Sequence, residues 1–169
     1  IKKIGEKAFY GCNQLQGKLI LPSGLERIED GAFYSCTGLT GSLDLPEGLA
    51  YVSGFENCKG LSGKLSFPEN LTDIGNSAFS GCDGFTGALV ISESVKRIGN
   101  SAFSGCTGLL GKLTLPGGLE TIGDSAFSGC HGLIGKLALP DTLTSIGCSS
   151  FEYCDGFIGE LRLPEGLHS

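Results

Sequence analysis

One 24-residue pattern recurs along the whole sequence and sets the strongest constraint on its fold. The clearest copy runs from Cys106 to Cys130, CTGLLGKLTLPGGLETIGDSAFSGC. Counted from Cys106, apolar residues stand at positions +3, +7, +9, +13, +16, +20 and +21, with glycine at +5 and proline at +10. A self-similar period of this length is typical of a solenoid, in which each copy forms one coil and neighbouring coils must stack to bury their apolar faces.

The glycine and proline positions indicate how each coil turns. Glycine stands at +5 in all seven copies, where it permits a positive φ angle or a bulge. The segment that follows, Lys112 to Leu115 in the clearest copy, alternates between outward and inward positions and predicts a β-strand. Proline at +10 has no N–H to donate and would end that strand. All six prolines of the chain lie at this position: Pro22, Pro46, Pro68, Pro116, Pro140 and Pro164.

The rest of each copy is rich in small residues, as in the segment SAFSGC. It is too short for a long helix and predicts a single helical or 3₁₀ turn with its phenylalanine inward. We therefore expect an α/β repeat solenoid over residues 1–169, a single unit of about seven 24-residue coils with predominantly short parallel β-strands. Because Ile1 lies in the middle of a repeat, we also expect a fragment of a longer array.

The second copy, between Cys36 and Cys58, is two residues shorter than the others. Its segment LAYVSGFENC keeps the apolar residues Val52 and Phe55, and its alanine position is expected to be lost. Since the shortening lies on the turn-rich side of the coil, we expect the strand register to be preserved.

Seven of the eight cysteines share one repeat position, and their spacing argues against disulfides. They form a column of side chains that point the same way, whereas a disulfide needs facing side chains. We predict buried thiols that pack as small apolar groups. Cys148 lies outside the column and is expected to be exposed and reduced, with pairing to Cys154 as the alternative. The column consists of Cys12, Cys36, Cys58, Cys82, Cys106, Cys130 and Cys154.

The charge balance and the lack of chemical motifs exclude several classes of function. With a net charge of −6, the chain is a poor partner for nucleic acids and anionic membranes. No apolar run approaches the length of a membrane span, so we expect no membrane insertion of this segment. His131 and His168 are far apart and lack cysteine pairs at zinc-binding spacing, so no metal site is expected. The sequence has no phosphate loop, dinucleotide fingerprint or nucleophile elbow, and we expect no cofactor and no catalytic residue.

The whole chain repeats the string L-x-x-x-L-x-L-P-x-x-L-x-x-I-G-x-x-A-F-x-x-C. This string resembles the BspA-like subclass of leucine-rich repeats. The resemblance implies a right-handed superhelix in a bacterial or protist surface protein. It also implies adhesion or protein binding, with host extracellular-matrix or plasma proteins as typical partners, and no shared catalytic residues. This repeat has one residue more than the common form of the subclass, beside the +5 glycine.

The variable outward positions of the predicted strand form the candidate ligand-binding face, since solenoids bind partners on an extended surface. Lysine recurs at +6, and position +8 contributes Thr114 and Arg162. Position +4 changes from polar residues in the early copies to apolar residues in three consecutive later ones. The lysines are Lys18, Lys64, Lys112 and Lys136, and the apolar residues are Leu110, Ile134 and Ile158.

Each of these features has two interpretations. The lysines either keep the chain soluble and protect its strands from aggregation, or form a docking strip for an acidic protein or a glycan. The three apolar residues either tuck against the adjacent corner of the coil, or remain exposed and mark an interface.

The function expected from the sequence is a non-enzymatic protein-binding or adhesion module of a secreted or cell-surface protein, with its ligand on the extended strand face. The alternative is a structural protein. Uncapped solenoid ends expose strand edges and apolar residues, and such ends could stack end to end into filaments. An enzyme would need a constellation of residues that we do not find.

Overall fold

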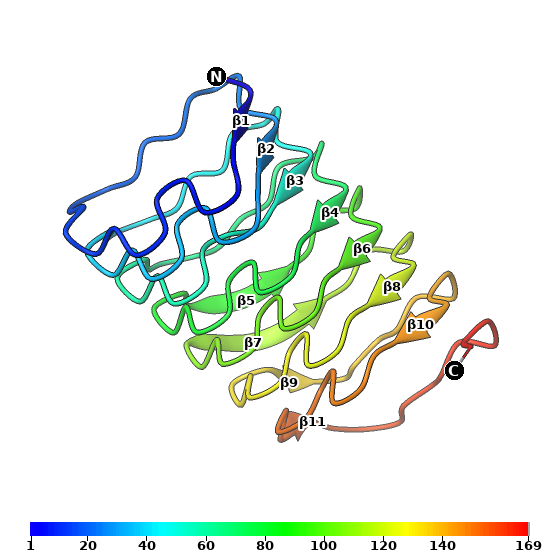
Figure 1. Ribbon diagram of the computed structural model, residues 1–169. Helices are drawn as coiled ribbons and strands as arrows, with labels where there is room; N and C mark the ends of the chain where they lie inside the picture. Colours follow the sequence, from blue (N-terminus) through cyan, green and yellow to red (C-terminus); the bar gives the residue numbers. More distant parts are fainter. Residues whose placement is uncertain (169) are drawn as a thin grey trace.

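The coils stack along one direction into a parallel β-solenoid in the computed structural model, which describes residues 1–168 (Figure 1). Its largest sheet has seven two-residue strands, one from each coil, in the order β1-β2-β3-β4-β6-β8-β10. These strands are β1 (Lys3–Ile4), β2 (Arg27–Ile28), β3 (Tyr51–Val52), β4 (Asp73–Ile74), β6 (Arg97–Ile98), β8 (Thr121–Ile122) and β10 (Ser145–Ile146). Each strand occupies positions +15 and +16 of its coil.

The register of this seven-stranded sheet keeps equivalent positions side by side. Arg27 pairs with Tyr51, and Asp73 pairs with Arg97, so position +15 forms one outward-facing row. Position +16 points inward, and its apolar side chain is buried in the five inner coils. The main strands were predicted at positions +6 to +9, and this prediction is wrong, because the strands of the largest sheet lie at +15 and +16. The buried +16 residues are Ile28, Val52, Ile74, Ile98 and Ile122.

The strand expected at +6 to +9 forms in some copies only. β5 (Gly87–Val90) pairs in parallel with β7 (Leu109–Thr114), and β9 (Ile134–Gly135) pairs with β11 (Gly156–Phe157). Several other copies contribute only isolated bridges between a +5 glycine and the +3 residue of the next coil. These short strands and bridges lie on a different side of the coils from the seven-stranded sheet (Figure 1).

A register shift at the +5 glycine keeps these strands short. Gly87 pairs with Leu109, but two residues later Leu89 pairs with Leu113, so the ladder contains a bulge. The φ angle of the +5 glycine lies between 81° and 103° in all seven copies, which confirms the predicted positive φ. This conformation is rarely open to residues with a β-carbon. The glycines are Gly17, Gly41, Gly63, Gly87, Gly111, Gly135 and Gly159.

The prediction of a helical or 3₁₀ turn for the SAFSGC segment is wrong, because residues 1–168 contain no helix. In the copy that ends at Cys106, Ser101 has a φ of 54° and Gly105 one of 71°, and both interrupt any helical path. The N–H groups of Ser101, Phe103 and Gly105 donate to carbonyls of the next coil at 2.7–2.8 Å. Only the alternate N–H groups bond three residues back. The segment is therefore a third line of hydrogen bonds between coils.

The core consists of columns of side chains from equivalent repeat positions, one from each coil. The rings of Phe103 and Phe127, for example, stack with centroids 5.3 Å apart and an interplanar angle of 7°. Such stacked pairs run from Phe9 to Phe151 without a break. The stacking explains why position +21 carries phenylalanine in every copy, the short one included.

The cysteine column is reduced and mostly buried, as predicted. All eight cysteines are free, and the five inner members of the column have no exposed surface. Each thiol from the second coil onward donates to a phenylalanine carbonyl of the preceding coil, as Cys106 Sγ does to Phe79 O at 3.0 Å. Burial raises the pKa of Cys58 and of Cys130 to about 12. Cys148 is exposed and free, so the alternative disulfide does not form.

The short second copy keeps the alanine position, contrary to the sequence analysis, and fills it with glycine. Phe33 N donates to Gly54 O at 2.8 Å, in the place where other coils use the alanine carbonyl. A β-carbon on Gly54 would lie 2.7 Å from Ala32 N, so this site has no room for alanine. The two missing residues are +18 and +19, and Val52 still pairs with Ile74, which confirms the expected strand register.

We predict that Cys58, Cys82 and Cys106 resist a maleimide reagent in the native protein, whereas Cys12 and Cys148 react quickly. The thiolate is the reactive form, and burial both shields these thiols and disfavours their ionisation. Mass spectrometry of native samples over time checks this. In denaturant all eight cysteines should react, and native labelling of Cys82 as fast as that of Cys148 would contradict the fold.

Gly135→Ala should lower the free energy of unfolding by about 1–3 kcal/mol, because the methyl group meets no neighbour but φ is +87°. Gly117→Ala is the matched control, since its site is equally open and its φ is not positive. It should change stability by less than about 0.5 kcal/mol. Urea unfolding measures both variants, and equal effects would remove the argument from backbone strain.

Candidate functional site

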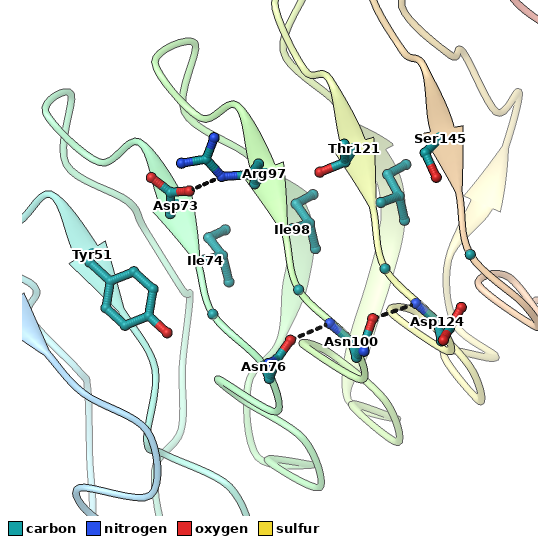
Figure 2. Close-up of a pocket in the computed structure, with 15 residues that line it drawn as sticks. Tyr51, Asp73, Ile74, Asn76, Arg97, Ile98, Asn100, Thr121, Asp124 and Ser145 are labelled. Atoms are coloured by element: carbon teal, nitrogen blue, oxygen red, sulfur yellow. Dashed lines mark hydrogen bonds and ion pairs between the residues drawn. The ribbon is translucent and has the colours of Figure 1, made fainter. Parts of the chain in front are cut away.

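A hollow of about 410 Å³ lies over the outer surface of the seven-stranded sheet and is the candidate functional site (Figure 2). We call it the sheet groove. It extends across the coils of β3, β4, β6, β8 and β10 and is lined by their residues at +15 to +18. Its polar lining includes Tyr51, Asp73, Arg97, Asn100, Thr121 and Asp124.

The floor of the sheet groove is bare backbone because position +17 is glycine in four consecutive coils. A β-carbon on Gly99 would lie 2.7 Å from Asn76 N, so each glycine packs directly on the preceding coil. The close contact leaves the +18 side chains as the lower rim of the groove. The glycines are Gly75, Gly99, Gly123 and Gly147.

A ladder of side-chain hydrogen bonds fixes this rim. Asn100 N donates to Asn76 Oδ1 at 2.9 Å, and Asp124 N donates to Asn100 Oδ1 at the same distance (Figure 2). Cys148 N donates to Asp124 Oδ1 at 2.7 Å. Each +18 side chain thus accepts from the backbone of the next coil and is held in one orientation. Cys148 has no carboxylate or amide and ends the ladder.

The opposite rim is formed by the +15 row and carries charge on one half only. Arg97 forms an ion pair with Asp73 (Figure 2), and the Arg27 guanidinium lies over the Tyr51 ring at 4.4 Å. Tyr51 Oη donates to Asp30 Oδ1 at 2.7 Å, and burial together with that carboxylate raises the pKa of the tyrosine. Thr121, in contrast, presents a hydroxyl at the same row position. This rim therefore has an ordered charged half and a neutral polar half.

A second ordered cluster lies beside the charged half. Glu29 accepts from Arg27 Nε at 2.9 Å and pairs with Lys3 Nζ at 3.2 Å. The hydrogen bond from Arg27 is the main cause that lowers the pKa of the Glu29 carboxyl. These contacts keep the side chains of the row in place before any partner arrives.

None of the residues expected to bind ligand lines the sheet groove. The lysines at +6 are all exposed; Lys112 lies in β7 and Lys136 directly follows β9. Lys18 pairs with Asp44 at 2.7 Å, and Arg162 lies 3.7 Å from Asp141. Thr114 is half-buried at the end of β7. The structure brings the +6 lysines Lys18, Lys64, Lys112 and Lys136 into one column, but on the other line of strands.

The three apolar residues at +4 are exposed. Leu110 is 57% exposed, Ile134 53% and Ile158 71%, so the tucked arrangement is not what the structure shows. Their exposure places an apolar stripe on the surface, away from the sheet groove.

Sequence reasoning missed the groove residues such as Tyr51 and Arg97. A signal was present, since the +15 row holds polar or charged residues in every copy, directly before the apolar +16 residue. Two residues are too few to show the alternation of a strand, and the row was not assigned to a sheet. The +15 residues are Lys3, Arg27, Tyr51, Asp73, Arg97, Thr121 and Ser145.

Within residues 1–168 no three His, Cys, Asp or Glu side chains are grouped so that they could hold a metal ion. In the same part of the chain, no helix has the length and apolar character needed to cross a membrane.

A family model described as the BspA type leucine rich repeat region matches residues 1–109 and 85–169, with six copies. The chain therefore belongs to the BspA-type leucine-rich repeat family. Among curated proteins, no sequence matches the chain.

Solved structures show the same fold. A T. pallidum leucine-rich repeat protein (TpLRR) is 35% identical with a TM-score of 0.78, over 91% of this chain and 70% of that one. A leucine-rich repeat protein from Bacteroides ovatus is 26% identical with a TM-score of 0.75, over 99% of this chain and 48% of that one. The pneumococcal vaccine antigen PcpA, at 21% identity over 74% of this chain and 35% of that one, shares the fold with a TM-score of 0.55. This chain thus spans about half and about a third of the latter two proteins.

Proposed function

We propose that this chain is a non-enzymatic protein-binding module of a secreted or cell-surface protein, and that its partner lies in the sheet groove. The observation that carries the proposal is the groove itself, an open polar surface that extends across five coils. Extended surfaces built from stacked coils are the common binding sites of solenoid proteins.

The ordered side chains of the groove support binding. Asn76, Asn100 and Asp124 are held by the ladder, and Asp73 holds Arg97. A partner that meets side chains already fixed in place loses less conformational entropy on binding. The Tyr51 ring and the Arg97 guanidinium are also residue types that carry much of the energy at protein interfaces.

The location and partner class of the proposal rest on family membership. BspA-like repeats are typical of bacterial and protist surface proteins, which makes an extracellular or cell-surface location and an extracellular-matrix or plasma protein the proposed setting. The whole parent protein's activity is part of the proposal too.

Thr121→Arg should weaken binding about tenfold or more, because the long arginine side chain fills the groove beside the neutral half of the +15 rim. The fold accommodates it, since Arg27 and Arg97 occupy the same row. Ser66→Arg is the matched control, placed at the +8 position that Arg162 occupies elsewhere. Interferometry against immobilised extracellular-matrix and plasma proteins measures the binding affinity of both variants. Equal loss in both, or none in Thr121→Arg, would contradict a partner in the groove.

The alternative function is self-assembly by end-to-end stacking into filaments. The end coils favour it, because Phe9 is 41% exposed and Leu161 is 55% exposed, whereas the equivalent inner residues are buried. Further repeats in a longer chain would cover the same surfaces, so the exposure alone does not separate the two functions.

Sedimentation velocity across a concentration series separates them. The binding-module proposal predicts one monomeric species at every concentration. Growth into progressively longer species as concentration rises would favour end stacking, since each added unit buries the exposed ends of two. Phe9→Ser would then shorten the species, while Thr121→Arg would leave them unchanged.

A further inference from the structure

The exposed residues Leu110, Ile134 and Ile158 form a continuous feature, which we call the apolar stripe. They occupy position +4 in three successive coils. The four preceding coils have polar residues there, so the stripe is confined to one end of the solenoid. The polar residues are Gln16, Thr40, Ser62 and Thr86.

Glycines at position +2 leave room for side chains of the stripe. A β-carbon on Gly132 would collide with Leu110 Cδ2, and one on Gly156 would collide with Ile134 Cγ2. Leu110 and Ile134 therefore each lie against the glycine of the following coil, and more than half of the surface of all three stripe side chains stays exposed.

The register shift at the +5 glycines brings lysines beside the stripe. Gly111 bridges to Leu133, which places Lys112 next to Ile134. Ile158 N donates to Gly135 O at 2.9 Å, which places Lys136 next to Ile158 in the same way. The alternation of apolar and cationic side chains thus runs along the solenoid axis.

The two lysines are not neutralised within residues 1–168. Lys18, in the same column, pairs with Asp44 at 2.7 Å, whereas neither Lys112 nor Lys136 has an ion pair in this part of the chain. They are exposed cations on a chain whose net charge is −6. Apolar side chains flanked by unpaired cations complement a segment with apolar and acidic residues.

We propose that the apolar stripe, with Lys112 and Lys136, is a docking strip for an extended protein segment in which acidic and apolar residues alternate. A second copy of this chain fits less well, because a two-fold contact places the same patch on both sides and would bring lysine against lysine. An anionic membrane is disfavoured by the negative charge of the whole chain.

The docking strip adds to the proposed function and does not depend on the sheet groove. The two surfaces share no residue, so their variants can fail separately. Thr121→Arg tests the groove alone, and substitutions at position +4 test the strip alone.

The repeat supplies substitutions that the fold already accepts. Leu110→Thr and Ile134→Thr introduce threonine, which two other copies carry at +4 as Thr40 and Thr86. Lys112→Ser and Lys136→Ala introduce the residues found at +6 in Ser42 and Ala88. Lys64→Ser is the matched control, because Lys64 lies in the lysine column but beside polar +4 residues.

The probe is a short fluorescein-labelled peptide of alternating glutamate and leucine, with a lysine–leucine peptide as counter-probe, measured by fluorescence anisotropy. We expect saturable binding of the acidic peptide that weakens with added salt. The double variants Leu110→Thr/Ile134→Thr and Lys112→Ser/Lys136→Ala should each weaken it about tenfold, a typical effect of removing central interface residues. Lys64→Ser and Thr121→Arg should leave it unchanged, and circular dichroism should show every variant folded.

Four results would overturn the proposal. They are no saturable binding of the acidic peptide, equal binding of the lysine–leucine peptide, unchanged binding by both double variants, and equal weakening by Lys64→Ser. Two other occupants have their own readouts. Binding to vesicles with anionic lipid that the double variants abolish would assign the strip to membranes, and dimers that the same variants dissociate would assign it to a second copy.

Discussion

The backbone hydrogen bonds between successive coils are the constraint on which this structure depends. Such bonds run along the seven-stranded sheet, along the +5 glycines and through the SAFSGC segment. Because each coil supplies the partners of the next, the same position must stack on itself along the axis. An inward position therefore has to suit the whole column. Within residues 1–168 the two buried polar residues also bond to a neighbouring coil, since Ser53 Oγ donates to Asn76 O at 2.9 Å and Ser150 Oγ donates to Gly123 O at 2.9 Å.

The same constraint explains the cysteines. The carbonyl of Phe79 accepts from Cys82 N and, on its other side, from Cys106 Sγ, both at 3.0 Å. A carbonyl oxygen has two lone pairs, and the thiol of the next coil uses the second one. Cysteine is small enough to fit beside the phenylalanine stack and still reaches this acceptor, whereas an alanine would leave the second lone pair without a donor from the protein. The column is thus both apolar filling and a weak hydrogen-bond ladder, and it performs both roles only as reduced thiols.

The sequence predicted those features that repeat at single positions. The solenoid, the positive φ of the +5 glycines and the free thiol column all follow from one residue type recurring at a fixed spacing. The seven-stranded sheet escaped prediction because its strands have two residues each, too few to show alternation. The helical turn was wrongly predicted because the sequence suggests only nearby partners, whereas the N–H of Phe103 bonds to Ala126 in the next coil. The sheet groove was missed because its residues meet only across coils, as Asp73 and Arg97 do.

The two candidate surfaces differ in a way that bears on the partners they suit. In the sheet groove the ladder residues and the Asp73–Arg97 pair already have partners, so a ligand must match a largely fixed pattern of donors and acceptors. Along the apolar stripe Lys112 and Lys136 are exposed and without ion pairs within residues 1–168, and the apolar side chains offer contact area without directional bonds. Fixed polar groups favour selectivity, because a mismatched ligand leaves them desolvated and unpaired. Unpaired cations beside apolar side chains favour attraction at a distance and tolerate different sequences. One solenoid can therefore hold a selective site and an adaptable one, since its two lines of strands vary independently around a common core.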